Sequence, residues 1–256
     1  MHVTPIRRLF ALLVLVSAAA HADGPLLWQN NSQTYLYGDN FAVKPPLQQT
    51  LTFEHASGWS VGDLFVFVDV THFNGRSDPF AGRDAYYGEL SPRLSLGKLS
   101  GRSIAFGPVT DLLVAATYEF GEGDVETWLL GPGVDLALRG FDYFKLNLYR
   151  RFPRHGRDGE TVQLTTVWSM TFPTGGSDIV FDGFIDWNLD SDGRYHRNLH
   201  FNPQIKYDLG KRMGWGGKRL YVGLEYTWWS NKYGIRDSAA FDTDESTASL
   251  LLKAHF

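Results

Sequence analysis

The chain has 256 residues, a formal net charge of −4, no cysteine and 27 glycines. The lack of cysteine excludes disulfide scaffolds, thiolate zinc sites, iron–sulfur clusters and thiol catalysis. The mild acidity argues against a dedicated nucleic-acid-binding protein, which would carry a basic face. Aromatic residues make up 15% of the chain, and such a content is typical of large antiparallel β proteins.

The first 22 residues have the pattern of an export signal. Two arginines precede an apolar run over 9–20, and Ala20-His21-Ala22 fits a small-x-small cleavage site. The run is shorter than the roughly 20 residues that a membrane-spanning helix needs. The pattern predicts a cleaved signal peptide over 1–22, with an N-terminal membrane anchor as the alternative. The remaining residues, 23–256, are predicted to form one domain.

Apolar and polar residues alternate with a period of two along most of this domain, which is the pattern of β-strands with one apolar face. In 198–209, for example, one face is apolar and the other carries amides and charges. The pattern predicts twelve strands, near 34–42, 47–56, 63–73, 86–97, 109–120, 125–138, 141–152, 160–172, 178–189, 197–209, 218–229 and 246–256.

The length of these segments distinguishes a barrel from a β-sandwich. Most run for about 10–12 residues, whereas strands of globular proteins average about 5–6. Ten residues tilted near 45° rise about 24 Å, close to the apolar band of an outer-membrane barrel, about 25 Å tall. Trp168, Trp187 and Trp228 are placed near strand ends on the apolar face, where an interfacial aromatic girdle is expected. The sequence therefore predicts an all-β fold, a closed antiparallel transmembrane β-barrel of about 12 strands in the bacterial outer membrane.

An even number of strands places both termini on the periplasmic side. The connections predicted to be extracellular are polar and charged, and they cover 74–85, 153–159, 190–196 and 230–245. One connection, 98–108, is long although the strand order places it in the periplasm. Pro92, Pro132 and Pro203 fall inside predicted strands, so we expect local bulges or missing ladder bonds at these positions.

If the apolar faces meet lipid, the opposite faces line a lumen. These faces combine aromatic rings with charges of both signs, which either fill the lumen as paired side chains or line a path for a solute. Only one strand histidine, His200, faces inward, and no serine is forced beside it, so a hydrolytic triad is not expected. The sequence predicts no enzyme, no metal site and no cofactor.

Residues 87–120 read YGELSPRLSLGKLSGRSIAFGPVTDLLVAATYEF. This segment resembles nucleoside-specific outer-membrane channels (the Tsx-like family), in which Glu-x-x-Pro-Arg-x-Ser-x-x-Lys-Leu precedes Phe-Gly-Pro. The matching positions are Glu89, Pro92, Arg93, Ser95, Lys98, Leu99, Phe106, Gly107 and Pro108. The resemblance implies a monomeric twelve-stranded barrel that passes nucleosides by facilitated diffusion, with outer loops that serve as phage or colicin receptors. It also places Phe41 in the pore lining, although Asn40 stands where the family has a basic residue.

The predicted function is therefore an outer-membrane channel for nucleosides or similar small polar solutes. A base can stack on an aromatic face, which contributes about 1–3 kcal/mol in stacking systems, and a ribose can donate hydrogen bonds to carboxylates. The residues predicted to line the pore and bind nucleosides are Phe41, Phe65, Phe67, Asp69, Glu89, Arg93, Glu119, Asp182, Asp186, Lys206, Arg219, Tyr221 and Glu225. The alternative is a plugged barrel that acts through its 74–85 and 230–245 loops as an adhesin or as a phage or colicin receptor.

Overall fold

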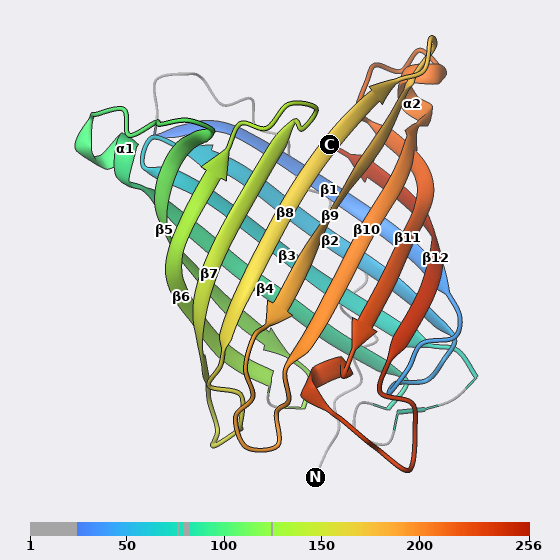
Figure 1. Ribbon diagram of the computed structural model, residues 1–256. Coiled ribbons are helices and arrows are strands. Elements are labelled where there is room, and N and C mark those ends of the chain that lie inside the picture. Colours follow the sequence, from blue (N-terminus) through green and yellow to red (C-terminus); the bar gives the residue numbers. More distant parts are fainter. Residues whose placement is uncertain (1–24, 76, 79–81, 124) are drawn as a thin grey trace.

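The computed structural model describes residues 25–75, 77–78, 82–123 and 125–256, so the predicted signal peptide over 1–22 lies outside the described residues. The described residues form a closed antiparallel barrel of twelve strands, in which each strand pairs with its neighbours in sequence and the last pairs with the first (Figure 1). The strands are β1 (Leu26–Gly38), β2 (Gln48–Trp59), β3 (Gly62–Phe73), β4 (Asp84–Ser95), β5 (Val109–Gly121), β6 (Val125–Leu136), β7 (Tyr143–Pro153), β8 (Val162–Pro173), β9 (Asp178–Asn188), β10 (Asn198–Asp208), β11 (Leu220–Ser230) and β12 (Glu245–His255). The predicted fold class is confirmed.

The main difference between predicted and observed strands is at the first one. The alternation predicts a strand near 34–42, whereas β1 begins at Leu26 and ends at Gly38. The polar residues 29–32 in its first half are held by pairing with β2, which does not require an apolar face. After Gly38 the chain turns, because Asn40 and Val43 have left-handed backbone angles, with φ of 70° and 68°.

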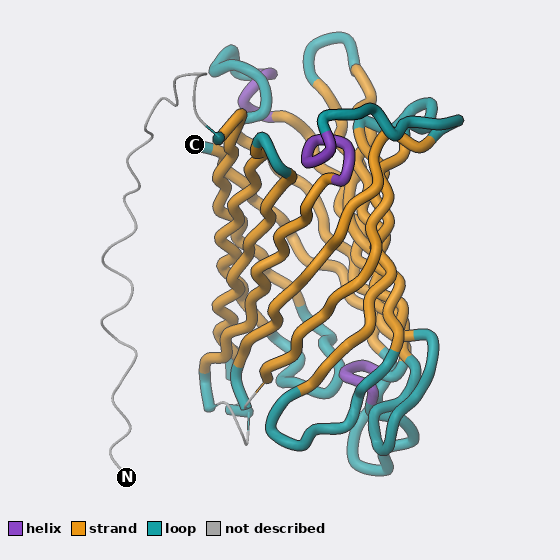
Figure 2. The backbone as a smooth tube through the Cα atoms, turned by 90° about the vertical axis from the view of Figure 1, so that its left-hand side faces the viewer, coloured by secondary structure: helices purple, strands orange, loops and turns teal. Residues whose placement is uncertain are grey.

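The two ends of the barrel differ in their connections. The end where β1 begins and β12 ends carries two short helices, α1 (Leu96–Ser100) and α2 (Leu209–Arg212); we call it the terminal end. The opposite end carries the 3-10 turn η2 (Lys232–Gly234) and the longer polar loops; we call it the loop end (Figure 2). The long connection that contains 98–108 lies at the terminal end, as the strand order predicts. No helix among the described residues is long and apolar enough to cross a membrane.

Three prolines inside strands interrupt the ladder between strands. Proline lacks the N–H that a ladder bond requires. Each proline position is paired on one side, with Leu64, Val114 and Gly183 as the respective partners. On the other side, the ladder has no pairs at 91–92 between β4 and β5, at 131–132 between β6 and β7, or at 202–203 between β10 and β11. The register is the same above and below each gap, so the missing ladder bonds are confirmed and no bulge accompanies them.

The barrel has an apolar outer face and a polar inner face. The outer positions expose large apolar side chains over a continuous band, which include Leu51, Leu90, Val114, Leu130, Leu148, Ile205, Leu224 and Leu250. The inner positions bury polar and charged side chains, which include Thr34, Arg93, Glu119, Arg151, Asn202, Lys206, Thr247 and Lys253. Burying charge inside while exposing leucine outside is stable only when hydrocarbon surrounds the barrel.

The predicted tryptophan girdle is present in part. Trp187 and Trp228 lie near the loop end of β9 and β11 and are 45% and 41% exposed on the outer face. Trp168 instead lies in the middle of β8 and is only 6% exposed. Its ring packs between those of Phe201 and Phe181, with centroid distances of 5.9 and 6.0 Å. The prediction of an interfacial position is therefore wrong for Trp168, because neighbouring outer-face aromatics cover it.

Candidate functional site

The concave side of the barrel brings together side chains from strands that are not neighbours. Arg93 on β4 reaches Asp135 on β6, and Arg151 on β7 reaches Glu119 on β5. Such contacts over an intervening strand form only on the inner side of a curved sheet. They identify the inner face of these strands.

Near the terminal end, Arg93 connects three strands. Its guanidinium donates to both carboxylate oxygens of Asp63, at 2.9 and 2.5 Å, and to both oxygens of Asp135, at 2.7 and 3.2 Å. Lys145 on β7 lies 3.5 Å from the same Asp63 carboxylate. Arg93 is 5% exposed, so a buried cation is fully surrounded by acceptors, which is the condition for burying a charge at low cost. This predicted pore residue is therefore part of a salt-bridge network.

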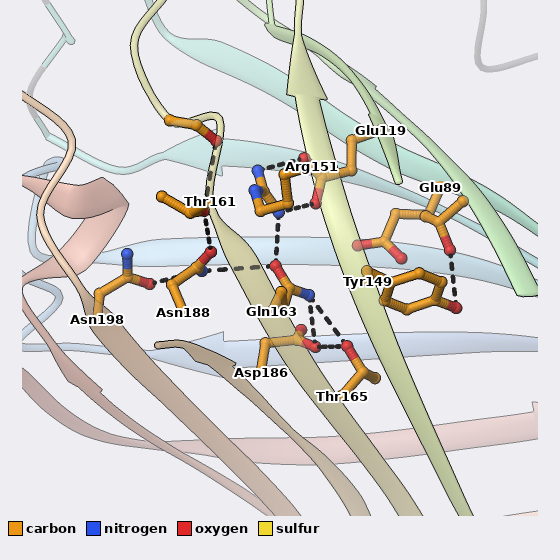
Figure 3. A network of polar contacts seen from close by, with 12 residues as sticks. Glu89, Glu119, Tyr149, Arg151, Thr161, Gln163, Thr165, Asp186, Asn188 and Asn198 are labelled. Atoms are coloured by element: carbon orange, nitrogen blue, oxygen red, sulfur yellow. Dashed lines mark hydrogen bonds and ion pairs between the residues drawn. The ribbon is translucent and has the colours of Figure 1, made fainter. Parts of the chain in front are cut away.

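A second network crosses the lumen wall near the loop end (Figure 3). Arg151 donates to Glu119 and, at 2.6 Å, to the amide oxygen of Gln163. The Gln163 amide nitrogen in turn donates to Asp186 at 3.0 Å, and Thr165 donates to the same carboxylate at 2.5 Å. Four strands, β5, β7, β8 and β9, are joined in this way. The predicted residues Glu119 and Asp186 thus belong to one connected network.

The wall formed by β9 to β12, together with β1 and β2, carries further pairs. Lys206 donates to Asp182 at 2.6 Å, and its ammonium lies 6.0 Å from the centre of the Tyr221 ring. Lys253 pairs with Glu54 on β2, across the closing seam. Glu225 accepts a hydrogen bond of 2.7 Å from the side-chain amide of Gln204. The predicted residues Asp182, Lys206, Tyr221 and Glu225 therefore line the same wall.

Aromatic rings and carboxylates alternate on the inner face of β3 and β4. The Phe67 ring lies 6.0 Å from Phe65 and 5.8 Å from Tyr87. Asp69 accepts a hydrogen bond of 2.5 Å from Thr52, and Glu89 accepts one of 2.8 Å from the Tyr87 hydroxyl. The strand pairing sets Phe67 opposite Glu89 and Asp69 opposite Tyr87, so these two rings each have a carboxylate beside them, whereas Phe65 lies opposite Ser91.

Four lumen carboxylates differ from the others in their partners. They are Asp69, Glu89, Asp186 and Glu225. Their hydrogen-bond donors are hydroxyls and amides, and no ion pair joins any of them to a lysine, arginine or histidine within the described part of the chain. The cations of the lumen are already taken by Asp63, Asp135, Glu119, Asp182 and Glu54. The lumen therefore contains four acidic side chains that no protein cation among the described residues pairs with.

Two predicted pore residues lie outside the strands. Arg219 is exposed in the connection before β11, at the terminal end, where its carbonyl oxygen accepts from the backbone of His255. Phe41 lies in the loop after β1, where its ring lies over Gly38 at the loop end. The structure therefore does not bring these two side chains together with the lumen networks or with each other.

Sequence reasoning missed a cluster at the loop end around Lys232 of η2. Lys232 is 4% exposed and forms an ion pair with Glu245 at the start of β12. Its ammonium lies 5.6 Å from the ring centre of Phe41 and 5.3 Å from those of Trp229 and Tyr233. We call Phe41, Trp229, Tyr233 and Glu245 the lysine cage. The only available signal was Trp229 on the polar side of its strand, since Lys232 itself reads as an ordinary loop charge.

The lysine cage continues into the lumen. The imidazole of His200 on β10 stacks on Trp229 with a centroid distance of 4.0 Å and an interplanar angle of 7°. Phe184 on β9 meets His200 edge-on at 5.0 Å. Burial lowers the pKa of the Lys232 amine, and the Glu245 carboxylate opposes this lowering. The ammonium of Lys232 thus depends on Glu245 and on the aromatic faces for its stabilisation.

The loops at this end are joined to one another by backbone hydrogen bonds. Asp192 accepts from the backbone N–H groups of Gly159 and Glu160, at 3.1 and 3.0 Å, and these bonds lower the pKa of its carboxyl. The N–H of His196 donates to the carbonyl of Gly234 in η2 at 2.8 Å. The 154–161, 189–197 and 231–244 loops therefore form one connected cap. Over the described ranges, no group of three His, Asp or Glu residues could hold a metal ion.

An apolar belt, a closed barrel and a charged lumen together define an outer-membrane barrel of the channel type. Residues 26–255 match the family model of the nucleoside-specific channel-forming protein Tsx. The chain belongs to this family, and it is an outer-membrane channel protein. The family and the fold are those of channels and porins, not of enzymes.

Individual relatives are distant. The chain is 28% identical over 199 residues to the outer membrane protein OmpK of Vibrio parahaemolyticus, covering 75% of this chain and 73% of that protein. It is 26% identical over 156 residues to the nucleoside-specific channel-forming protein Tsx of Klebsiella aerogenes, covering 49% of this chain and 53% of that protein. Among solved structures, the KdgM porin superposes with a TM-score of 0.50 at 11% identity, over 88% of this chain and 99% of that one. That last likeness concerns the fold alone.

Proposed function

We propose that this channel passes nucleosides, or closely similar solutes, down their concentration gradient. The observation that carries the proposal is the alternation of rings and carboxylates on β3 and β4, where Phe67 faces Glu89 and Tyr87 faces Asp69. A nucleoside has the same two parts, an aromatic base and a hydroxyl-rich sugar. Membership of the family supports the same assignment.

The base would stack on the Phe67 and Tyr87 rings, which lie 5.8 Å apart. Stacking of a base on an aromatic side chain contributes about 1–3 kcal/mol. The ribose hydroxyls would donate to Asp69 or Glu89, in place of the hydroxyl donors that these carboxylates have now. A site of this strength binds weakly, so a solute can enter it and still leave.

The proposal also explains why the sugar hydroxyl and not a phosphate would be accepted. Asp69, Glu89, Asp186 and Glu225 have no cationic partner among the residues that the structure describes. A phosphate carries about two negative charges and would meet uncompensated carboxylates in a narrow, weakly screened space. A nucleoside is neutral and does not experience this repulsion.

Liposome swelling tests the proposal directly. Proteoliposomes with the full chain should swell faster in an isotonic nucleoside than in a sugar of equal size, and faster than with the matching nucleotide. Phe67→Ala should reduce the nucleoside rate. Phe53→Ala, on the outer face of neighbouring β2, is the matched control and should leave that rate unchanged. Equal rates for nucleoside and sugar would reduce the protein to an unspecific pore.

We keep the plugged barrel as a second candidate because the lysine cage and the joined loops cover the loop end. In that case the loops would act as a surface for adhesion or for a phage or colicin. Because one chain closes the barrel by itself, we propose a monomer for either function. Proteoliposomes that show no swelling with any small solute would favour the second candidate.

A further inference from the structure

The lysine cage has the composition of a site for an organic ammonium group. Three aromatic rings from the β1–β2 loop, β11 and η2 surround one position within 5.3–5.6 Å of each ring centre. A carboxylate, Glu245, lies at the same position and is 2% exposed. Aromatic faces together with a carboxylate are how proteins recognise ammonium groups.

The cage already holds an ammonium, that of the chain's own Lys232. It is not saturated by this occupant. Oxygen Oε2 of Glu245 accepts from Lys232 and from the backbone N–H of Ala42, whereas its buried Oε1 has no hydrogen-bond partner in the described chain. The buried Nε2 of His200, next to Trp229, is also without a partner there. The cage thus retains polar atoms for a larger ligand than a primary amine.

The loop that carries Lys232 is held in an unfavourable backbone conformation. Asn231 and Tyr233 have left-handed φ angles of 48° and 59°, a region that non-glycine residues rarely adopt. The ion pair and the ring contacts of Lys232 oppose this cost, together with the bond between Asn231 and the carbonyl of Arg197. We therefore expect the turn to lose this conformation when Lys232 leaves the cage.

The lumen next to the lysine cage also favours cations over anions. On β11, Glu225 lies four residues further into the lumen than Trp229, which corresponds to about 13 Å along a strand. Glu225 and, on β3, Asp69 have no cationic partner in the described chain. A cation that leaves the cage inward thus next meets acidic side chains that no protein cation of the described part pairs with, which favour a cation over an anion.

We propose that the lysine cage binds the ammonium group of organic cations at the outer mouth, and that Lys232 is a tethered competitor which keeps the 231–244 loop folded into the mouth. Solute ammonium groups displace Lys232 and free the loop. This inference does not depend on nucleosides being the transported solute. A tethered group competes at a high effective concentration, so removing the tether should expose the site.

The test uses choline and its neutral analogue 3,3-dimethylbutan-1-ol, which has the same shape without the charge. Ion current is recorded across planar bilayers that contain the full-length protein. Choline should block current through Lys232→Ala at a concentration about tenfold or more below that needed for the parent protein, since the effective concentration of the tether is then removed. The neutral analogue should not block either protein.

Two further variants separate the cage from a general effect of charge. Lys232→Arg keeps a tethered cation and should behave as the parent protein does. Adding Trp229→Leu to Lys232→Ala removes one wall of the cage and should abolish the new choline block. Equal block of the parent protein and of Lys232→Ala, or equal block by the neutral analogue, would overturn the proposal.

A measurement on the unaltered protein covers the case in which Lys232→Ala does not fold. Trypsin cleaves after lysine, and Lys232 is buried, so cleavage there requires the loop to leave the cage. Choline should accelerate cleavage after Lys232 in the native protein, whereas the neutral analogue should not. Cleavage after Arg102, which is exposed in the connection between α1 and β5 at the opposite end of the barrel, is the internal control and should not change. If choline does not accelerate this cleavage, even above the concentration that blocks the ion current, Lys232 is not displaced and the proposal is wrong.

Discussion

The two terminal nitrogens of Arg151 each donate to a different carboxylate oxygen of Glu119, at 2.8 Å, although β6 lies between their strands. Both side chains are about one-tenth exposed or less. The pair therefore closes the inner side of three strands with a bidentate contact. Removal of one partner leaves a buried charge without compensation, which strongly destabilises the folded protein.

We therefore predict that Arg151→Met lowers the free energy of unfolding by about 3–5 kcal/mol, the usual cost of leaving one buried charge unpaired. Urea unfolding in lipid vesicles measures it. The double variant Arg151→Met with Glu119→Gln should recover part of the loss. The matched control is Arg150→Ala, the preceding residue, whose ion pair with Glu160 is exposed and 3.6 Å long; it should cost about 0–1 kcal/mol. Equal losses for Arg151 and Arg150 would show that the inner pair adds nothing.

Close approach of strands beside Pro132 leads to a second prediction. A Cβ at Gly131 would lie 1.8 Å from the carbonyl oxygen of Leu148, a backbone atom that cannot rotate away. Gly131→Ala should therefore destabilise the barrel by about 1–3 kcal/mol, the usual cost of overpacking. At Gly176 the nearest atom to such a Cβ is 3.8 Å away, so Gly176→Ala should fold as the parent does. Comparison of the two urea midpoints checks the difference.

The uncompensated carboxylates predict the sign of ion selectivity. Negative charge along a pore favours cations, so the reversal potential in a KCl gradient should indicate permeation of K⁺ over Cl⁻. Neutralising Asp69, Glu89 and Glu225 together to their amides should shift that potential toward zero. Asp84→Asn is the control, because Asp84 pairs with His72 on the outer face and is about half exposed. A potential that stays the same after the triple change would disprove this assignment.

The loop contact of Asp192 predicts a response to acid. Its pKa is lowered in the folded protein by the N–H groups of Glu160 and Gly159. A lowered pKa means that the contribution of the carboxylate is complete above its unfolded pKa, about 3.9, and is lost as pH falls through the folded value. The Gly159 and Glu160 amides should thus have smaller protection factors in hydrogen exchange below pH 3 than at pH 6. The protection factor already accounts for the pH dependence of the intrinsic exchange rate. Asp192→Ala should give the low-pH behaviour at both pH values.

The barrel could be predicted from the sequence because lipid outside and polar side chains inside impose a strict period of two. This rule placed the segments from 47–56 onward and the inner faces of β3, β10 and β12. It failed at β1, because Trp28 to Ser32 are held by pairing to β2 and not by an apolar face. It also misplaced Trp168, because the alternation shows which side of the barrel wall a side chain lies on but not which neighbouring side chains cover it.

The lysine cage could not be predicted for a different reason. Its members come from residues 41, 229–233 and 245, and closure of the barrel brings the first of these next to the others. No local pattern encodes that meeting. Ion-pair partners inside the lumen were also out of reach, because Arg93 and Asp135 are 42 residues apart and meet over an intervening strand. The sequence identified the lumen charges but not which of them neutralise one another.

The interrupted ladders at Pro92, Pro132 and Pro203 have a mechanical consequence. Each gap omits rungs at one strand boundary, and alignment is retained on both sides of it. Such a boundary can part and rejoin without slipping. By contrast, β2 and β3 pair without interruption from Gln48–Phe73 to Trp59–Gly62. We therefore expect local opening of the wall to occur first at these three boundaries, where fewer backbone hydrogen bonds join the strands.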